Sequence, residues 1–348
     1  MDIRRHLLAG HVIPAHPLAL DAQGRFSERH QWALTRYYLD AGAGGLAVGV
    51  HSTQFEIREP KHALFKPVLS LAAATATEEQ RRTGREVALI AGICGRTPQA
   101  LAEAELARSF GYHAAMVSMT AFKTDPEETI LAHVTEVAGL LPVVGFYMQP
   151  AVGGRVFSVS FWRRLATIPS VVAIKIAPFN RYQTLDVVRA VIEAGRDDIA
   201  LYTGNDDTIV TDLLTPFTFE AQERRVTRRI VGGLLGHWGV WTRSAVSLLD
   251  EIKAATREPQ LEAAWLTRAA AVTDMNAAVF DTAHGFSGCI AGILEVLRRQ
   301  GLVESARCLN SREVLSPGQA DELTRVCRAH PELTDDEFVA THRDRWLR

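Results

Sequence analysis

Lysine is scarce in this sequence. Only five of its 38 basic residues are lysines, at positions 61, 66, 123, 175 and 253, and arginine supplies the rest. Cysteine is also scarce, with four residues and no CxxC pair. This usage excludes a disulfide framework and a zinc ribbon, and it predicts reduced thiols. Because lysine is so rare in this sequence, the position of each lysine is informative.

The sequence has no excess of either charge, with 38 Lys+Arg against 40 Asp+Glu and a formal net charge of -2. A surface for nucleic acid or an anionic membrane would need a basic excess, so neither partner is expected. No apolar run approaches the roughly 20 residues of a membrane span, and no signal-peptide core is present near the N-terminus. The predicted location is the cytoplasm.

What the sequence does contain is a repeated alternation of short apolar runs with helical patterns. The runs lack polar alternation, which is typical of strands buried on both faces. They cover residues 11–16, 45–50, 87–94, 114–119, 143–147, 171–176, 199–204 and, less clearly, 230–241. Helical patterns lie between them, with Thr97-Pro98 as an expected helix start and Asp125 to Glu128 as an expected capping box.

Eight such units of about 30 residues predict a parallel α/β fold, a (β/α)8 TIM barrel. No GxGxxG opens a helix after a strand, which argues against a dinucleotide-binding fold. We expect the barrel to occupy residues 1–245. Residues 246–348 contain only helical patterns and are expected to form a C-terminal helical extension packed on the barrel.

Lys175 is the main anomaly, because it interrupts the apolar strand that runs from Val171 to Ile176. Burial of an ammonium group is unfavourable, and a desolvated lysine has a lowered pKa. Its neutral amine can attack a carbonyl carbon to form a Schiff base. The alternative is a lysine at the end of a strand whose amine reaches solvent.

Tyr147 ends the preceding strand. Adjacent barrel strands would place it at the same rim as Lys175, where a phenol can transfer protons beside an imine. The alternative is a packed aromatic residue whose hydroxyl is hydrogen-bonded.

These residues belong to a longer pattern. It consists of Y-x-x-P from Tyr147 to Pro150, then Gly154, and then Val172-Ala173-Ile174-Lys175, and it extends to Ala41–Leu46 and to Gly204-Asn205-Asp206. The pattern resembles the dihydrodipicolinate synthase/N-acetylneuraminate lyase family. The resemblance implies a (β/α)8 lyase that acts on 2-oxo acids. It makes Lys175 the imine-forming residue and Tyr147 the proton-transferring phenol. It also implies a homo-oligomer, a dimer or a tetramer.

The sequence departs from the family pattern at several positions. The family motif G-T-T-G-E corresponds here to Val50-His51-Ser52-Thr53-Gln54. Ser52 and Thr53 are expected to help hold the substrate carboxylate, and His51 either relays a proton or is a structural imidazole. A family tyrosine after the fourth strand corresponds to Phe122, so that hydroxyl is missing.

A third departure concerns the substrate. The arginine that grips a second carboxylate in dihydrodipicolinate synthases corresponds to Val152, so true dihydrodipicolinate synthase activity is not expected.

Other candidates follow the seventh and eighth strands. Gly204 and Asn205 are expected at the substrate site, where Asp206 or Asp207 either orients a hydroxyl group or caps a helix. Trp238 either lines a pocket wall or packs in the core.

The sequence therefore predicts a Schiff-base aldolase or dehydratase of a 2-oxo acid that needs no cofactor and no metal. Two alternatives stay open: a metal-dependent barrel enzyme, and a barrel that binds an oxo acid or sugar acid without catalysis. The 12 histidines motivate the former, although no HxH motif is present.

Overall fold

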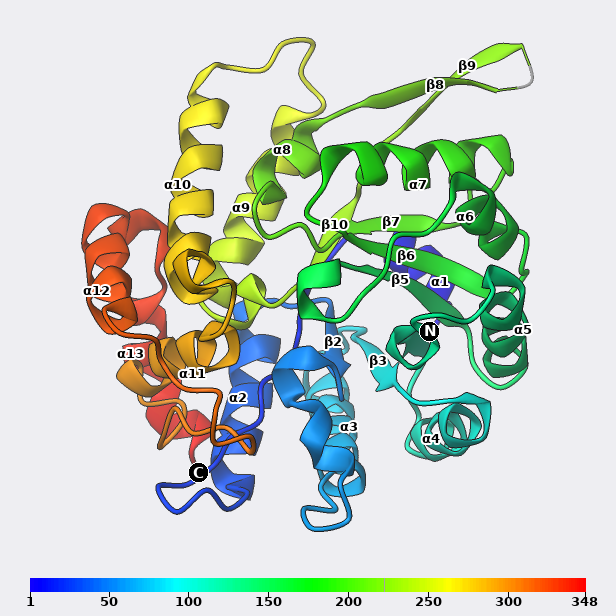
Figure 1. Ribbon diagram of the computed structural model, residues 1–348. Helices are drawn as coiled ribbons and strands as arrows, with labels where there is room; N and C mark the ends of the chain where they lie inside the picture. Colours follow the sequence, from blue (N-terminus) through cyan, green and yellow to red (C-terminus); the bar gives the residue numbers. More distant parts are fainter. Residues whose placement is uncertain (222) are drawn as a thin grey trace. The chain divides into compact units, whose positions relative to one another are not determined.

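The computed structural model describes residues 1–221 and 223–348, shown in Figure 1. The chain divides into two compact units. The first comprises residues 1–11 and 88–234, and the second comprises residues 12–87 and 235–348. Each unit is described by itself.

The first unit is built on a parallel sheet whose six strands are hydrogen-bonded in chain order. The strands are β3 (Ala88–Ile93), β4 (Ala114–Val117), β5 (Val143–Met148), β6 (Val171–Ala177), β7 (Ala200–Thr203) and β10 (Gly232–Leu235). Every residue in these six strands is buried, as their continuous apolar runs predict.

Helices separate these strands along the chain. The α-helices are α1 (Ile3–Leu8), α4 (Thr97–Ser109), α5 (Glu127–Ala138), α6 (Val159–Ala166), α7 (Arg181–Glu193) and α8 (Ile209–Leu214), and short 3-10 turns are η3 (Thr120–Phe122) and η4 (Pro150–Val152). Two expected caps are not formed. Pro126 occupies the N-cap of α5 without a side-chain bond, and Thr97 is the first residue of α4 rather than its cap. The Thr97 hydroxyl bonds to His133 instead.

An antiparallel ribbon that the sequence did not predict lies between α8 and β10 along the chain. Its strands are β8 (Phe217–Ala221) and β9 (Arg224–Arg228), which pair from Phe217 opposite Arg228 to Ala221 opposite Arg224. Figure 1 shows the ribbon as a long arm next to α7. It has no helical partner in sequence, so an alternation of strands with helices could not predict it.

The second unit contains the parallel strands β1 (Val12–Pro14) and β2 (Gly45–Val48), with a bridge from Ala15 to Ala47. Its helices are α2 (Glu28–Ala41), α3 (Phe65–Thr83), α9 (Thr242–Ala255), α10 (Ala264–Val279), α11 (Cys289–Arg299), α12 (Gln319–Ala329) and α13 (Asp336–Trp346), with 3-10 turns η1 (His51–Thr53), η2 (Phe55–Arg58), η5 (His237–Gly239), η6 (Thr282–His284) and η7 (Pro331–Leu333). In the described part of the chain, no helix is long and apolar enough to cross a membrane.

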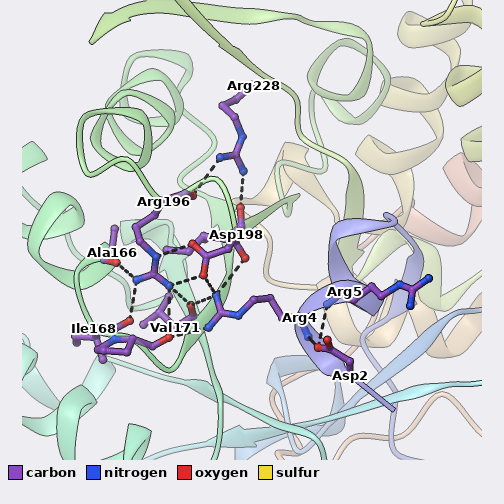
Figure 2. Close-up of polar contacts among 11 residues, drawn as sticks. Asp2, Arg4, Arg5, Ala166, Ile168, Val171, Arg196, Asp198 and Arg228 are labelled. Carbon is purple, nitrogen blue, oxygen red and sulfur yellow. Dashed lines mark hydrogen bonds and ion pairs between the residues drawn. The ribbon is translucent and has the colours of Figure 1, made fainter. Parts of the chain in front are cut away.

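The N-terminal helix α1 of the first unit is held by an arginine cluster, drawn in Figure 2. Arg4 donates to the Pro169 carbonyl at 2.7 Å and forms an ion pair with Asp198. Arg196 also binds Asp198, at 2.6 Å from its Nε. Arg228 donates to the carbonyl of Ile199 at 2.6 Å. The bonds of Arg4 join α1 to the loops that precede β6 and β7, and those of Arg196 and Arg228 hold the loop before β7.

Candidate active site

Lys175 lies in the middle of the sheet, on β6. Its neighbours across the sheet are Phe146 on β5 and Tyr202 on β7, so the three side chains share one face. The ammonium nitrogen lies 4.5 Å from the centre of the Phe146 ring, and the Tyr202 hydroxyl donates to the Leu7 carbonyl of α1 at 2.8 Å. We call this the inner face of the sheet. The outer face is the opposite one, which the helices cover.

The Lys175 side chain is buried, with 9% of its surface exposed. Burial lowers the pKa of Lys175 to about 8, although the negative charge of Asp206 partly opposes the change. With a pKa near 8, roughly a tenth of the amine is neutral at pH 7, compared with less than about one part in a thousand for a solvated lysine. Lys175 is therefore chemically suited to attack a carbonyl carbon.

Gly204 makes room for the lysine. A Cβ atom at this position would lie 2.6 Å from Lys175 Cε and 2.7 Å from Ala177 Cβ, closer than carbon atoms can approach. The Gly204 amide donates to the Ile176 carbonyl at 2.7 Å, which continues the β6–β7 pairing past the end of β7. Gly204 thus lies beside Lys175, where the absence of a side chain leaves room for the lysine, and its role in substrate binding stays a prediction.

Asn205 is buried, and its side-chain amide makes three hydrogen bonds inside the protein. Its Oδ1 accepts from the Phe179 amide at 3.0 Å, while its Nδ2 donates to Thr184 at 3.0 Å and to Asp212 at 2.9 Å. These bonds fix the loop after β7 against the loop after β6, where Phe179 has a φ of +52°. Asn205 therefore positions the loop, and its role at the substrate site stays a prediction.

Asp212 of α8 stabilises this loop through its side chain. Its side chain is completely buried and accepts a hydrogen bond from Thr203 at 2.7 Å in addition to the bond from Asn205, and it forms an ion pair with Arg181. Burial raises the pKa of Asp212, whereas its hydrogen bonds act in the opposite direction. The resulting network makes the β7–α8 loop a rigid support for the residue that follows Asn205, which is Asp206.

Tyr147 lies on the outer face. The register places Tyr147 opposite Ile176, not opposite Lys175. Its ring packs on Trp162 of α6 with centroids 4.9 Å apart, and its hydroxyl oxygen accepts from the Phe157 amide at 3.4 Å. Burial raises the pKa of Tyr147 to about 12. The register and these contacts place Tyr147 on the face opposite to that of Lys175, and the proton-transfer role of Tyr147 stays a prediction.

A shift in strand register explains this difference. Val143 is opposite Val171, but Val144 is opposite Ala173, so β6 contains one extra residue at this point. With uniform pairing from Val143, Tyr147 would lie opposite Lys175. Because side chains alternate between faces, a shift of one residue moves a side chain to the other face.

Three predicted residues, His51, Ser52 and Thr53, form η1 in the second unit. The Thr53 hydroxyl donates to the His16 carbonyl at 2.6 Å and accepts from two backbone amides, which uses its full capacity. The Ser52 hydroxyl donates to the Ala15 carbonyl at 2.7 Å. The His51 ring lies 5.9 Å from the Phe55 ring. Thr53 thus stabilises the loop after β2, and the substrate roles of His51 and Ser52 stay predictions.

Trp238, also in the second unit, is 1% exposed and belongs to the largest fully buried side chains. Its carbonyl oxygen accepts from the Thr242 hydroxyl at 2.7 Å, which connects η5 to the start of α9. This burial favours core packing over a pocket wall. Across residues 1–221 and 223–348, no group of three or more His, Cys, Asp or Glu residues is arranged to hold a metal ion.

Comparison with solved structures identifies the class of fold, a (β/α)8 barrel with a helical C-terminal region, as predicted. A dihydrodipicolinate synthase from Oceanobacillus iheyensis has a TM-score of 0.74 at 15% identity, over 95% of this chain and 98% of that one. An N-acetylneuraminate lyase from Fusobacterium nucleatum has a TM-score of 0.71 at 15% identity, over 94% and 100%. A dihydrodipicolinate synthase from Acinetobacter baumannii, complexed with pyruvate, has a TM-score of 0.72 at 17% identity, over 92% and 98%.

The family is identified by sequence. Residues 9–216 match the model of the Dihydrodipicolinate synthetase family, and the chain belongs to that family. Comparison with curated proteins gives no significant match. The family resemblance predicted from the residues around Lys175 is therefore confirmed, and the low identities make this chain a divergent member.

Proposed function

We propose that this protein is a Schiff-base-forming lyase, an aldolase or dehydratase, that acts on a 2-oxo acid through Lys175. One observation carries the proposal: Lys175 is buried on the inner face of the sheet, with a pKa lowered to about 8. A buried structural lysine would need a hydrogen-bonded acid to hold its charge, whereas a nucleophilic lysine needs the opposite, a pKa low enough to supply neutral amine. Family membership supports the same role.

In the proposed reaction, the neutral Lys175 amine attacks the 2-oxo carbon, and loss of water leaves a protonated imine. The imine nitrogen then withdraws electrons from the neighbouring C3 atom. This stabilises the carbanion that results from C–C cleavage or from removal of a C3 proton. Phe146 contributes by holding the amine against its ring face, where a cationic nitrogen is favoured.

The substrate class follows from the family and from one substitution. The solved relative from Acinetobacter baumannii is complexed with pyruvate, which supports a 2-oxo acid. Val152, where the resemblance expects an arginine, cannot bind a second carboxylate. We therefore propose a 2-oxo acid substrate and an activity other than dihydrodipicolinate synthesis.

The position of Tyr147 favours a second candidate, a barrel that forms the imine or binds the oxo acid without turnover. Tyr147 lies on the outer face, so the phenol that the family resemblance assigned to proton transfer is not beside the amine. Such a protein would bind 2-oxo acids but would not convert them. Measurement of adduct formation together with product formation separates the two candidates.

The experiment is reductive trapping. The protein is incubated with pyruvate and a panel of larger 2-oxo acids, reduced with borohydride, and analysed by intact and peptide mass spectrometry. We expect an adduct on Lys175 that is lost in Lys175→Ala and also in Lys175→Arg, because a guanidinium cannot form the imine. Lys253→Ala, in which a half-buried lysine of α9 is replaced, is the matched control and should keep the adduct.

The results of the trapping experiment distinguish the lyase from the non-catalytic candidate. No adduct with any 2-oxo acid, or an adduct on another lysine, would overturn the lyase proposal. An adduct on Lys175 without product from any member of the panel would favour the non-catalytic candidate.

A further inference from the structure

We propose that the ring of Phe146 stabilises the protonated imine that Lys175 forms with its substrate, which makes Phe146 a further catalytic residue of this protein. The inference rests on the proposed Schiff-base function and deepens it. The positive charge matters after the attack of the amine, because only a protonated imine withdraws electrons strongly from the neighbouring C3 atom.

Phe146 faces Lys175 because β6 contains one extra residue. The register places Phe146 of β5 directly opposite Lys175, and both side chains lie on the inner face. The ammonium nitrogen lies 4.5 Å from the centre of the Phe146 ring, within the range of a cation–π contact. The Phe146 side chain is buried, so water screens this contact only weakly. The same shift in register that places the phenol of Tyr147 on the outer face therefore places a phenyl ring beside the reactive nitrogen.

Burial of Lys175 has opposite consequences at two stages of the proposed reaction. Before the attack, burial favours the neutral amine, and the pKa of Lys175 is lowered to about 8. After loss of water, the same burial disfavours the positive charge on the imine nitrogen. An imine nitrogen is also less basic than the amine from which it forms, so it loses its proton more easily. A group that stabilises positive charge at this position is therefore needed for the imine to withdraw electrons.

The ring face of Phe146 is suited to this task because it attracts a cation without being a base. The electron-rich face of the ring interacts with the positive charge, and the attraction is larger at a desolvated site than in water. A carboxylate also attracts a cation, but it can take away the proton that gives the imine its charge. A phenyl ring has no such acid–base chemistry, so it favours the protonated imine without competing for the proton.

Two titratable groups act at the same place. Tyr202 of β7 lies opposite Lys175, and the charge of Asp206, in the loop after β7, raises the pKa of Lys175 against the effect of burial. Burial raises the pKa of Tyr202 far above its usual value, and its hydroxyl donates to the Leu7 carbonyl, so this residue stays neutral. Chemical changes within the Phe146 ring leave both groups in place, and they therefore isolate the contribution of the ring.

The pKa of the imine can be measured with cyanoborohydride, which reduces protonated imines much faster than neutral ones. The imine is formed with saturating pyruvate, the pH is changed rapidly, and the rate of adduct formation is followed by intact mass spectrometry. For Phe146→Leu, which removes the ring but keeps an apolar side chain, we expect the pH at which reduction falls to half to decrease by about one unit. Phe161→Leu, which changes another buried phenylalanine of the first unit, is the matched control and should keep the wild-type midpoint.

Fluorinated phenylalanines at position 146 provide a second test, because they keep the shape of the ring and weaken its electron-rich face. One, two and three fluorine atoms should lower the midpoint progressively, toward the value for Phe146→Leu. A wild-type midpoint in Phe146→Leu, or a fluorinated series without a trend, would overturn the proposal. Absence of an adduct in the wild-type protein, with pyruvate and with every larger 2-oxo acid, would instead refute the Schiff-base function and the role of Phe146 with it.

Discussion

Each face of the β5–β6 pair buries one polar side chain, Lys175 on the inner face and Tyr147 on the outer face, and burial has a different chemical consequence for each. On the inner face, Lys175 is held among Phe146, Tyr202 and the Gly204 backbone, and burial leaves its amine with a lowered pKa. On the outer face, Tyr147 is packed between Trp162 and Phe157, and burial raises the pKa of its hydroxyl. Burial favours the neutral form of both groups, but only for the amine is that form the reactive nucleophile.

This difference shows that burial near a strand end is not sufficient to define a site. The chemistry depends on which protonation state burial favours and on which face of the sheet the side chain occupies. Three experiments test the contrast between the two faces.

The largest effect is expected on the inner face, from Gly204→Ala. The added methyl group would lie 2.6 Å from Lys175 Cε, so the lysine side chain must move from its position. We expect the rate of borohydride-trapped adduct formation with pyruvate to fall by about 100-fold, since small displacements of a reacting group have effects of this size. Gly139→Ala, at the end of α5, is the control and should keep the rate. An unchanged rate in Gly204→Ala would show that the lysine does not depend on this packing.

An intermediate effect is expected from pH. Because the pKa of Lys175 is lowered to about 8, the neutral fraction rises as the pH increases through this value. Between pH 7 and pH 9 the initial rate of adduct formation should increase roughly tenfold and then level off. Asp206 is the charged group that acts on this pKa, so Asp206→Asn should move the midpoint to lower pH. A midpoint near 10, as for a solvated lysine, would contradict the burial of the amine in solution.

The smallest effect on chemistry is expected on the outer face. Tyr147→Phe keeps the ring and removes only a hydroxyl that accepts one bond at 3.4 Å, so adduct and product rates should change by less than about threefold. Tyr147→Ala removes the ring between Trp162 and Phe157 and should lower the free energy of unfolding by about 3–5 kcal/mol in urea titrations. Loss of product formation by a folded Tyr147→Phe would show that the phenol is catalytic and that the inner face needs it.

Much of the fold could be predicted from sequence, because buried parallel strands leave continuous apolar runs that differ from the amphipathic helices between them. For Lys175 the sequence left two alternatives open, a buried amine and an amine that reaches solvent, and the structure buries the side chain. The face of Tyr147 could not be predicted. The spacing of 28 residues from Tyr147 to Lys175 is unaffected by one extra residue in the pairing at Val144, but the face of every later side chain depends on it.

Other details were missed because they depend on contacts distant in sequence. The roles of Asn205 and Thr53 were expected at the substrate, but the structure uses their polar groups within the protein. No local sequence pattern shows that Asn205 accepts a hydrogen bond from the Phe179 amide, or that the Thr53 hydroxyl donates to the His16 carbonyl. The β8–β9 ribbon was missed because the expected eighth strand–helix unit had no place for an antiparallel pair.

The bond between Arg4 and Asp198 has a consequence for synthesis of the chain. These residues are separated by 194 positions, so the N-terminal helix leaves the ribosome long before the loop that receives it. At usual translation rates of about 5–20 residues per second, α1 waits for roughly 10–40 s without its partner. During this interval α1, whose residue Leu7 is completely buried in the folded protein, lacks its contacts with β7 and its bond to Asp198. The first unit consists of residues 1–11 and 88–234, so it can fold completely only after residue 234 has been made.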